Sequence, residues 1–177
     1  MKQTKNSYLA IISILFLISS IQMFSQEDLS EKSFGISALV QDGQFDILLP
    51  IVLKNTGVIA PAIGFASVSK AGMDIILGIV TRFYLNDSKV KPFLGGRAGV
   101  LFFSPSKPEG SSIDPESTKD FVFGFLAGGE YFLDEGFSFG VEAQLNASVS
   151  DKNSRRFGNP GGFNMNTATA IFATVYF

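Results

Sequence analysis

Apolar and polar residues alternate along much of the chain with the two-residue period of a half-buried β-strand. The clearest example is the run 137–149, where one face carries Phe, Val, Ala and Leu and the other carries Ser, Gly, Glu, Gln and Asn. Eight such runs follow one another, separated by turn-forming residues. The predicted strands are 33–41, 45–53, 58–68, 73–85, 90–103, 119–133, 137–149 and 167–177.

The connections between these runs differ in length, and the difference predicts a topology. Asp42-Gly43 is a strong hairpin signal. The connections after the second, fourth and sixth runs are short: 54–57, 86–89 and 134–136. The stretches 104–118 and 150–166 are long and rich in Ser, Pro, Gly and Asn. Short turns at one end and long loops at the other are typical of a membrane-spanning barrel. We expect an all-β fold, an eight-stranded antiparallel up-and-down transmembrane β-barrel with short periplasmic turns and two long outer loops.

Two of the predicted strands contain a proline, Pro50 in the run 45–53 and Pro61 in the run 58–68. Proline has no backbone N–H and cannot donate to a β-ladder. We therefore expect β-bulges or irregular pairing in both strands.

The composition places the apolar residues on the outside of the sheet. Mean hydropathy is +0.27, yet after the first 26 residues no apolar run approaches the length of a spanning helix. The chain has 19 Phe, 4 Tyr and no Trp, so Phe and Tyr would form the aromatic girdles of a barrel. The alternative is a soluble β-sandwich with a Phe-rich core, which explains the high hydropathy less well.

Residues 1–25 have the features of an export signal that is cleaved from the mature chain. Lys2 and Lys5 precede an apolar run over 8–21, and Ser25 is a small residue at a suitable cleavage point. An N-terminal transmembrane helix is the alternative, although the run is short for one. Residues 26–177 then form the barrel domain, with 12 basic and 16 acidic residues and a net charge of −4. Such a surface argues against nucleic acid as a partner.

The absence of His and Cys restricts the possible chemistry. A Ser-His-Asp triad needs an imidazole base, and a zinc site needs His or Cys ligands, so we expect no enzyme, no metal and no cofactor. The alternation predicts a lumen charge cluster of Arg82, Arg97, Glu130 and Glu142. Buried charges must be paired, and we expect Arg97 with Glu130 and Arg82 with Glu142. A gated polar pathway and a Glu130–Glu142 acid/base pair are the alternatives.

The glycine pairs Gly95-Gly96 and Gly128-Gly129 superficially suggest a phosphate-binding loop. They lack the following helix and the Lys-Ser/Thr of such a loop. Glycine in a barrel strand marks a bulge or leaves room for a large neighbour, and that is the interpretation we favour.

The two long stretches have opposite charge and are candidate contact sites. The first contains Glu109, Asp114 and Glu116, and the second contains Arg155 and Arg156. These loops could pair with each other, bind cations or lipopolysaccharide phosphates, contact an unknown surface partner, or simply be solvated. Function often resides on such loops, although no calcium-loop pattern is present.

Several segments resemble known barrels: the signal ending FSQ, then ILLPIVL, APAIGFA, KVKPFLGGRAGVLF and the terminal ATVYF. Together they resemble small eight-stranded outer-membrane proteins of the OmpX and OmpA-barrel type, and the "porin family" outer-membrane β-barrel domains of Gram-negative bacteria. The resemblance implies an outer-membrane location among lipid and lipopolysaccharide. It also implies that the barrel-assembly machinery reads an assembly signal in the last strand, formed by Phe177, Val175, Ala173 and Ile171.

The function that follows is a non-enzymatic integral outer-membrane protein. Its role would be envelope-structural, or surface interaction through its extracellular loops. A minor porin or small-solute channel is one alternative, and a soluble lipocalin-like periplasmic binder is another.

Overall fold

The computed structural model describes residues 33–53, 56–68, 72–107, 110 and 116–177. The expected export signal lies outside these residues. The described strands are β1 (Gly35–Gln41), β2 (Gln44–Leu48), β3 (Ile51–Leu53), β4 (Gly57–Val68), β5 (Gly72–Tyr84), β6 (Val90–Pro105), β7 (Thr118–Phe132), β8 (Phe137–Val149) and β9 (Phe163–Tyr176). Among the described residues, no helix is long and apolar enough to cross a membrane.

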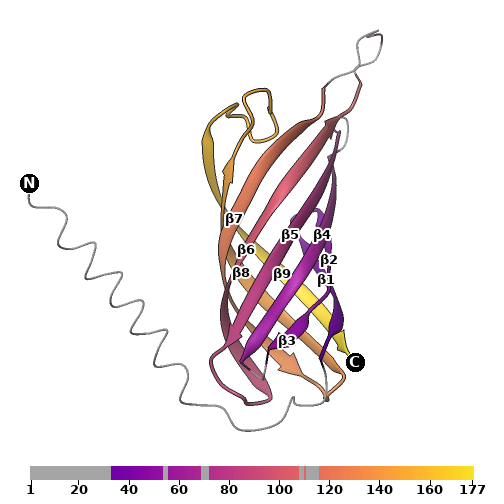
Figure 1. Ribbon diagram of the computed structural model, residues 1–177, viewed down its shortest axis with the longest axis vertical. Helices are drawn as coiled ribbons and strands as arrows, with labels where there is room; N and C mark the ends of the chain where they lie inside the picture. Colours follow the sequence, from indigo (N-terminus) through magenta and orange to yellow (C-terminus); the bar gives the residue numbers. More distant parts are fainter. Residues whose placement is uncertain (1–32, 54–55, 69–71, 108–109, 111–115) are drawn as a thin grey trace, which may run out of the picture.

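The strands form one closed antiparallel barrel (Figure 1). β1 pairs with β2, and from β3 to β9 each strand pairs with the next one in sequence. The pairs β1–β9 and β2–β4 complete the ring. β2 and β3 both pair with β4 and act as one interrupted strand, so the nine segments make eight barrel strands. The predicted eight-stranded up-and-down barrel is therefore confirmed.

The strand registers define how steeply the strands run around the barrel. Directly paired residues lead from Ser37 through Leu48, Ala62, Gly78, Gly99, Val122 and Ser148 to Asn164. Ser37 itself pairs with Thr174, which is ten residues from Asn164 along β9. With a rise of about 3.3 Å per residue and strands about 4.8 Å apart, this stagger gives a strand tilt of about 40°. Membrane barrels have tilts of about 35–45°.

Pro50 interrupts the second predicted strand, as expected. β2 ends at Leu48 and β3 begins at Ile51. The pairs Leu48–Ala62 and Ile51–Ile59 nevertheless keep a single register, so no extra residue is inserted. The irregular pairing at Pro50 is confirmed, and it is a local loss of hydrogen bonding without a bulge.

Pro61 does not interrupt its strand, and the expected irregularity there is wrong. β4 runs continuously through Pro61. Each proline loses a donor but keeps its carbonyl as an acceptor: the Gly35 N–H donates to Pro50 O at 2.7 Å, and the Leu49 N–H donates to Pro61 O at 2.9 Å. One missing donor in a long ladder does not change the register.

Side chains are distributed inside out relative to a soluble protein. Large apolar residues point outward from the strands, and Phe125 and Ile171 are 76% and 64% exposed. Polar residues such as Ser37 and Thr174 point inward and are fully buried. The Thr174 hydroxyl donates to Ser37 Oγ at 2.9 Å, across the seam where the first and last strands meet. This arrangement suits a barrel surrounded by lipid.

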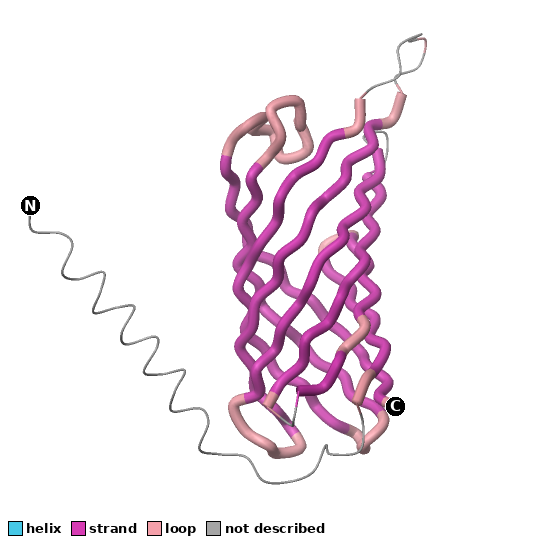
Figure 2. Tube along the Cα trace, viewed as in Figure 1, coloured by secondary structure: helices cyan, strands magenta, loops and turns pink. Residues whose placement is uncertain are grey.

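Turns and loops lie at opposite ends, as predicted (Figure 2). The β5–β6 and β7–β8 turns share one end with the C-terminus, and the β8–β9 loop lies at the other end, together with the tight β1–β2 turn. The β1–β2 turn is tight, and Asp42 and Gly43 have φ of 32° and 77°. β9 begins at Phe163, earlier than predicted, because Asn164 and Asn166 alternate with apolar residues and continue the strand pattern.

Because the outer face of the barrel is apolar, we predict that detergent is needed to extract the protein. We also predict that the protein stays folded in that detergent. We expect the mature chain to require detergent for extraction and to migrate differently on a gel before and after boiling, because the closed barrel stays folded until heated. Outer-membrane fractionation followed by gel electrophoresis measures both properties. Recovery in the soluble fraction without detergent would contradict this result and support the lipocalin-like alternative.

Candidate functional site

The four predicted lumen charges all point into the barrel, from four consecutive strands. Arg82 lies on β5, Arg97 on β6, Glu130 on β7 and Glu142 on β8. Arg82, Glu130 and Glu142 are at most 2% exposed, and Arg97 is partly buried. The structure forms one of the two predicted pairs, Arg82 with Glu142, but not the other.

Arg82 and Glu142 form the expected ion pair. Arg82 Nη2 and Nε donate to Glu142 Oε2 at 3.0 Å and 3.3 Å, and Gln144 Nε2 donates to Glu142 Oε1 at 2.7 Å. The guanidinium also lies 3.7 Å from the ring centroid of Phe172 and 5.2 Å from that of Phe93. Both charges are therefore satisfied without water, which a buried pair requires.

Two glycines make room for these aromatic rings. A Cβ at Gly128 would lie 2.6 Å from Phe93 Cζ, and a Cβ at Gly140 would lie 2.4 Å from Phe172 Cζ. Gly128 is the direct cross-strand partner of both Phe93 and Glu142, so a large, a small and a charged residue alternate across three strands. The expectation that Gly128 accommodates a large neighbour is confirmed.

Among the residues that the structure describes, no cation forms an ion pair with Glu130, so the expected Arg97–Glu130 pair is wrong. Its carboxylate accepts hydrogen bonds from Tyr84 Oη at 2.7 Å, Tyr176 Oη at 2.9 Å and Ser138 Oγ at 2.5 Å. Arg97 pairs across strands with Gly124, six residues from Glu130 along β7. That separation is about 20 Å of strand, so the two side chains face the lumen at different heights.

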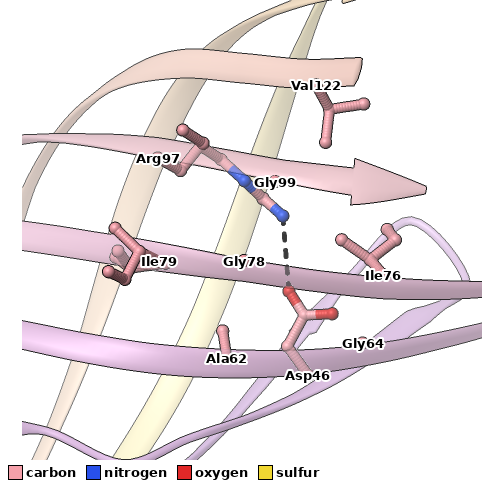
Figure 3. A pocket seen from close by; sticks show the side chains of 11 residues that line it. Asp46, Ala62, Gly64, Ile76, Gly78, Ile79, Arg97, Gly99 and Val122 are labelled. Atoms are coloured by element: carbon pink, nitrogen blue, oxygen red, sulfur yellow. Dashed lines mark ion pairs between the residues drawn. The ribbon is translucent and has the colours of Figure 1, made fainter. Parts of the chain in front are cut away.

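Arg97 instead forms an ion pair with Asp46, shown in Figure 3, and a hydrogen bond with Gln144. Its Nη2 lies 3.6 Å from Asp46 Oδ2, and its Nη1 donates to Gln144 Oε1 at 2.9 Å. Asp46 was not among the predicted site residues, because the run 45–53 is otherwise apolar on both faces. The sequence signal was its position between Phe45 and Ile47, both of which point outward.

A second unpredicted pair lies at the end of the lumen that carries the short β5–β6 and β7–β8 turns. Lys91 Nζ donates to Asp87 in the β5–β6 turn, and both side chains are largely buried. The ammonium also lies 5.0 Å from the Phe132 ring centroid and 5.8 Å from that of Tyr84. This end of the lumen is therefore filled by aromatic rings and a folded-in turn.

Large side chains enclosed by their neighbours fill the inner half of the lumen. Glu130, Phe93, Glu142 and Arg82 expose 0–2% of their surface, which means that a water-sized sphere touches almost none of it. The carboxylates of Glu130 and Glu142 are enclosed by protein groups and not accessible to a substrate, which disfavours the acid/base alternative. Among the described residues, no three His, Cys, Asp or Glu side chains converge on a possible metal site.

The β8–β9 loop, residues 150–162, is anchored inside the outer mouth of the barrel. The Asp120 carboxylate, on β7, is fully buried and accepts hydrogen bonds from the Asp151 N–H and from Ser154 Oγ, both at 2.8 Å. Ser154 is also fully buried, although it lies in a polar loop. These contacts hold the start of the loop against the barrel wall.

A second anchor joins the same loop to β5, which is two strands from β7 in the barrel. Arg156 Nε donates to Asp74 Oδ2 on β5 at 2.7 Å. Phe157 packs against the lumen residues Ile76, Leu101 and Phe103. The loop is therefore folded inward on two carboxylates and an apolar contact.

The residues predicted as loop contacts differ in where the structure places them. Arg156 points inward and pairs with Asp74, although 28% of its side chain is still exposed; its role as a loop contact stays a prediction. Arg155 and Glu116 are exposed at the outer end. Glu109 and Asp114 lie outside the described residues.

The last strand has the predicted outward face. Phe177, Val175 and Ile171 are exposed on the lipid side, and the Phe177 ring stacks on Phe34 with centroids 5.4 Å apart. The Phe177 N–H donates to Phe34 O at 2.9 Å, which ties the C-terminus to the start of β1. The role of Phe177, Val175, Ala173 and Ile171 in assembly remains a prediction.

The sequence matches no protein-family model and no curated protein sequence. It is similar in structure to Neisserial surface protein A (NspA), with a TM-score of 0.54 at 15% identity over 81% of this chain and 93% of that one. The N-terminal β-barrel domain of Pseudomonas aeruginosa OprF gives a TM-score of 0.49 at 13% identity, with 81% and 95% of the two chains covered. Ail, the attachment invasion locus protein of Yersinia pestis, gives 0.37 at 18% identity, with 81% and 92% covered.

The similarity to NspA, together with the closed barrel, shows that this chain has the fold of the small eight-stranded outer-membrane β-barrels. The resemblance seen in the sequence is confirmed at this level. At 15% identity the similarity concerns the fold alone.

The buried ion pair predicts unequal effects of the two lumen arginines. We expect Arg82→Leu to lower the free energy of unfolding by about 3–5 kcal/mol, because Glu142 would remain buried without its cation. Arg97→Ala should cost about 1–2 kcal/mol, since Asp46 and Gln144 keep other partners. Urea unfolding in lipid vesicles measures both values. The double variant Arg82→Leu/Glu142→Leu should be more stable than Arg82→Leu alone. If Arg82→Leu unfolded like the parent, the Arg82–Glu142 pairing would be contradicted.

The loop anchors predict slow proteolysis at Arg155. We expect Asp120→Ala and Asp74→Ala each to accelerate trypsin cleavage after Arg155 by about tenfold or more, because each removes anchoring bonds of about 1–3 kcal/mol. Cleavage is followed on intact cells by mass spectrometry. Asp134→Ala, which removes a turn-capping carboxylate at the periplasmic end, is the matched control, and equal cleavage rates in all variants would rule out the anchors.

Proposed function

We propose that this protein is a non-enzymatic outer-membrane anchor that presents a pre-organised basic loop at the cell surface. The observation that carries the proposal is the inward anchoring of the β8–β9 loop on Asp120 and Asp74. Because those carboxylates fix the loop, its outward side chains keep a defined position. The fold shared with small outer-membrane barrels supports an outer-membrane location.

The outward side of the loop carries a net positive charge, with two exposed cations and one exposed carboxylate, that of Asp151. Lys152 and Arg155 are exposed, whereas Arg156 is turned inward to Asp74. A fixed cationic surface favours anionic partners, and its attraction weakens as salt increases. We therefore propose an anionic surface as the partner, with lipopolysaccharide phosphates of the outer leaflet as a nearby source. Engagement of the last strand by the barrel-assembly machinery during biogenesis is part of the same proposal.

The filled lumen disfavours the porin alternative. The layer of Arg82, Glu142, Phe93 and Phe172 occupies the lumen, and the Lys91–Asp87 pair lies below it. A solute would have to break a buried ion pair to pass. The apolar exterior disfavours the soluble periplasmic binder, because water would contact most of the outward aromatic rings.

Adhesion of whole cells tests the proposal. Cells that display the parent should be retained on beads coated with dextran sulfate but not on neutral dextran. We expect Lys152→Ala/Arg155→Ala to reduce retention by about fivefold, since two exposed charge contacts amount to about 1 kcal/mol. The effect should shrink at high salt.

The control is Lys89→Ala, which removes a cation from the turn at the periplasmic end of the barrel. It should leave retention unchanged at equal surface levels. Retention that is insensitive to Lys152→Ala/Arg155→Ala would contradict the proposed role of the loop. Conductance steps of stable size in planar bilayers would support the minor porin instead.

A further inference from the structure

The barrel wall has a notch above the β1–β2 turn, at the outer end of the barrel. Gln41, at the end of β1, pairs with Ala170, whereas β9 begins seven residues earlier, at Phe163. On the other side of the notch, β2 likewise starts below the outer end of β4. The β1–β2 turn therefore lies below the outer ends of the long strands (Figure 2). As a result, the β9 segment 163–169 pairs with β8 alone.

The burial of the inward-facing side chains of β9 changes at the level of the notch. Ala170, which lies opposite Gln41, is 1% exposed. Asn166, four residues further out on the same face of the strand, is exposed. It also lines a cavity of about 150 Å³ in the outer half of the lumen, together with Arg97 and with Phe157 of the β8–β9 loop. The notch therefore borders this cavity.

The hydrogen bonds at the inner end of β9 show which backbone groups face the notch. The Phe177 N–H donates to Phe34 O, on the β1 side, at 2.9 Å. The Tyr176 N–H donates to Gly136 O, on the β8 side, also at 2.9 Å. The N–H and C=O of one residue point to the same side of an antiparallel strand, and this side alternates along the strand. The register with β8 is regular along the whole of β9, so its odd-numbered residues point to the β1 side and, further out, to the notch.

Three residues consequently present both backbone groups to the notch, and they are Met165, Thr167 and Thr169. Among the described residues, none forms a hydrogen bond with these N–H or C=O groups. Phe163 points the same way, but its carbonyl accepts a hydrogen bond from Asn159 Nδ2 at 3.3 Å. A row of free donors and acceptors along a strand edge is a template for pairing with another strand.

Most of this edge lies outside the apolar part of the membrane. Thr167 is ten residues from Phe177 along the chain. With a rise of about 3.3 Å per residue and a tilt of about 40°, ten residues cover about 25 Å along the membrane normal. The apolar band of membrane barrels is also about 25 Å tall. Counted from Phe177, the edge from Thr167 outward therefore lies at and beyond the outer boundary of the band, where a water-soluble partner has access.

A second copy of this chain does not fit the edge. Two copies in one membrane are related by an axis along the membrane normal. Their β9 strands would both run from the outer end inward and would tilt in opposite directions, so the strands would cross. Neither a parallel nor an antiparallel ladder forms between crossed strands. An extended segment of another protein meets the requirement, because its direction is not restricted by the membrane.

Charged side chains at the two ends of the edge favour one direction of such a segment. Asp42 is exposed in the turn at the base of the notch. At the outer end Lys152 is exposed, and a Cβ at Gly161 would lie 3.5 Å from Lys152 Cγ. Arg155 and Asp151 are exposed as well, so the charge at this end is positive by one unit. A segment antiparallel to β9 would therefore carry a cation at its N-terminal end and a carboxylate at its C-terminal end.

We propose that the edge of β9 from Phe163 to Thr169 binds an extended segment of another protein by strand addition. The segment runs antiparallel to β9, with a cation beside Asp42 and a carboxylate beside Lys152. The free backbone groups provide affinity, and apolar side chains of the segment pack beside Phe163 and Met165, which are 53% and 59% exposed. This site goes beyond the basic face of the loop and shares only Lys152 with it, so either proposal can fail without the other.

Backbone amide exchange, read by NMR on the mature chain in phosphatidylcholine nanodiscs, tests the edge. The probe is the acetylated and amidated heptapeptide Lys-Thr-Val-Thr-Val-Thr-Glu. Without it, we expect fast exchange at Met165, Thr167 and Thr169 and slow exchange at Asn166, whose N–H points to β8. Saturating peptide should slow the three fast amides by about tenfold or more. Slow exchange at these amides without peptide would mean that the edge is already covered, and either this result or the absence of any peptide effect would overturn the proposal.

Two N-methylated peptides distinguish strand addition from apolar adhesion. One carries N-methyl groups on its threonines and the other on its valines, and their side chains are unchanged. Alternate N–H groups of an added strand point to its neighbour. One of the two peptides should therefore lose binding while the other keeps it, and equal affinities of the two would overturn strand addition. The peptide with Lys and Glu exchanged should bind more weakly than the original, and equal affinity would overturn the antiparallel direction.

A variant of the edge assigns the peptide to β9. Thr167→Pro removes one N–H that faces the notch and leaves the ladder with β8 intact, because that N–H is not part of it. We expect it to weaken peptide binding by about fivefold or more. Thr167→Val keeps the N–H, so it is the matched control and should bind like the parent. A folded Thr167→Pro barrel that binds like the parent would overturn the proposal, and if this variant does not fold, the N-methylated pair decides.

Discussion

The Arg82–Glu142 ion pair between two phenylalanine rings is the contact on which the lumen depends. The pair joins β5 to β8 across the interior, and the rings that enclose it come from β6 and β9. Each ring requires a glycine on a neighbouring strand, Gly128 or Gly140. A narrow barrel must fill its lumen with side chains, and charges placed there must be compensated by protein groups.

This constraint divides the barrel into two halves with different properties. Below Arg97 the side chains exclude water, and Glu130 is satisfied by hydroxyl groups instead of a cation. Above Arg97 the interior widens into a cavity roofed by a loop that is bound to Asp74 and Asp120. The barrel interior is therefore filled in its inner half and contains a cavity in its outer half. The charged side chains of the inner half are enclosed by protein groups, whereas those of the outer half border a cavity.

The sequence could predict what depends on alternation along a strand. Inward and outward faces follow the two-residue period, so the lumen positions of Arg82 and Glu142 and the outward position of Phe177 were accessible. The height of a residue along the barrel axis could not be predicted from the sequence, because it depends on the registers of all the intervening strands. Arg97 and Glu130 share a face yet lie six residues apart in the β6–β7 register.

Long-range contacts of loops were also beyond the sequence. Asp120 and Ser154 are 34 residues apart, and neither stands out from the polar residues around it. Asp46 was overlooked because its neighbours are apolar and its partner, Arg97, lies on a strand that is not adjacent in the barrel. Only the folded barrel brings these groups together.

The seam between β1 and β9 has a consequence for how the chain folds. Ser37 and Thr174, which meet there, are 137 residues apart, the kind of separation that slows folding because distant parts of the chain must find each other. Phe172 and Tyr176 of β9 also supply a ring to Arg82 and a hydroxyl to Glu130. Arg82 and Glu130 therefore each lack one of their partners until the last strand docks. A barrel without its last strand is stabilised less by contacts in its lumen. Closure of the barrel wall and filling of the lumen are therefore expected to occur in one cooperative step.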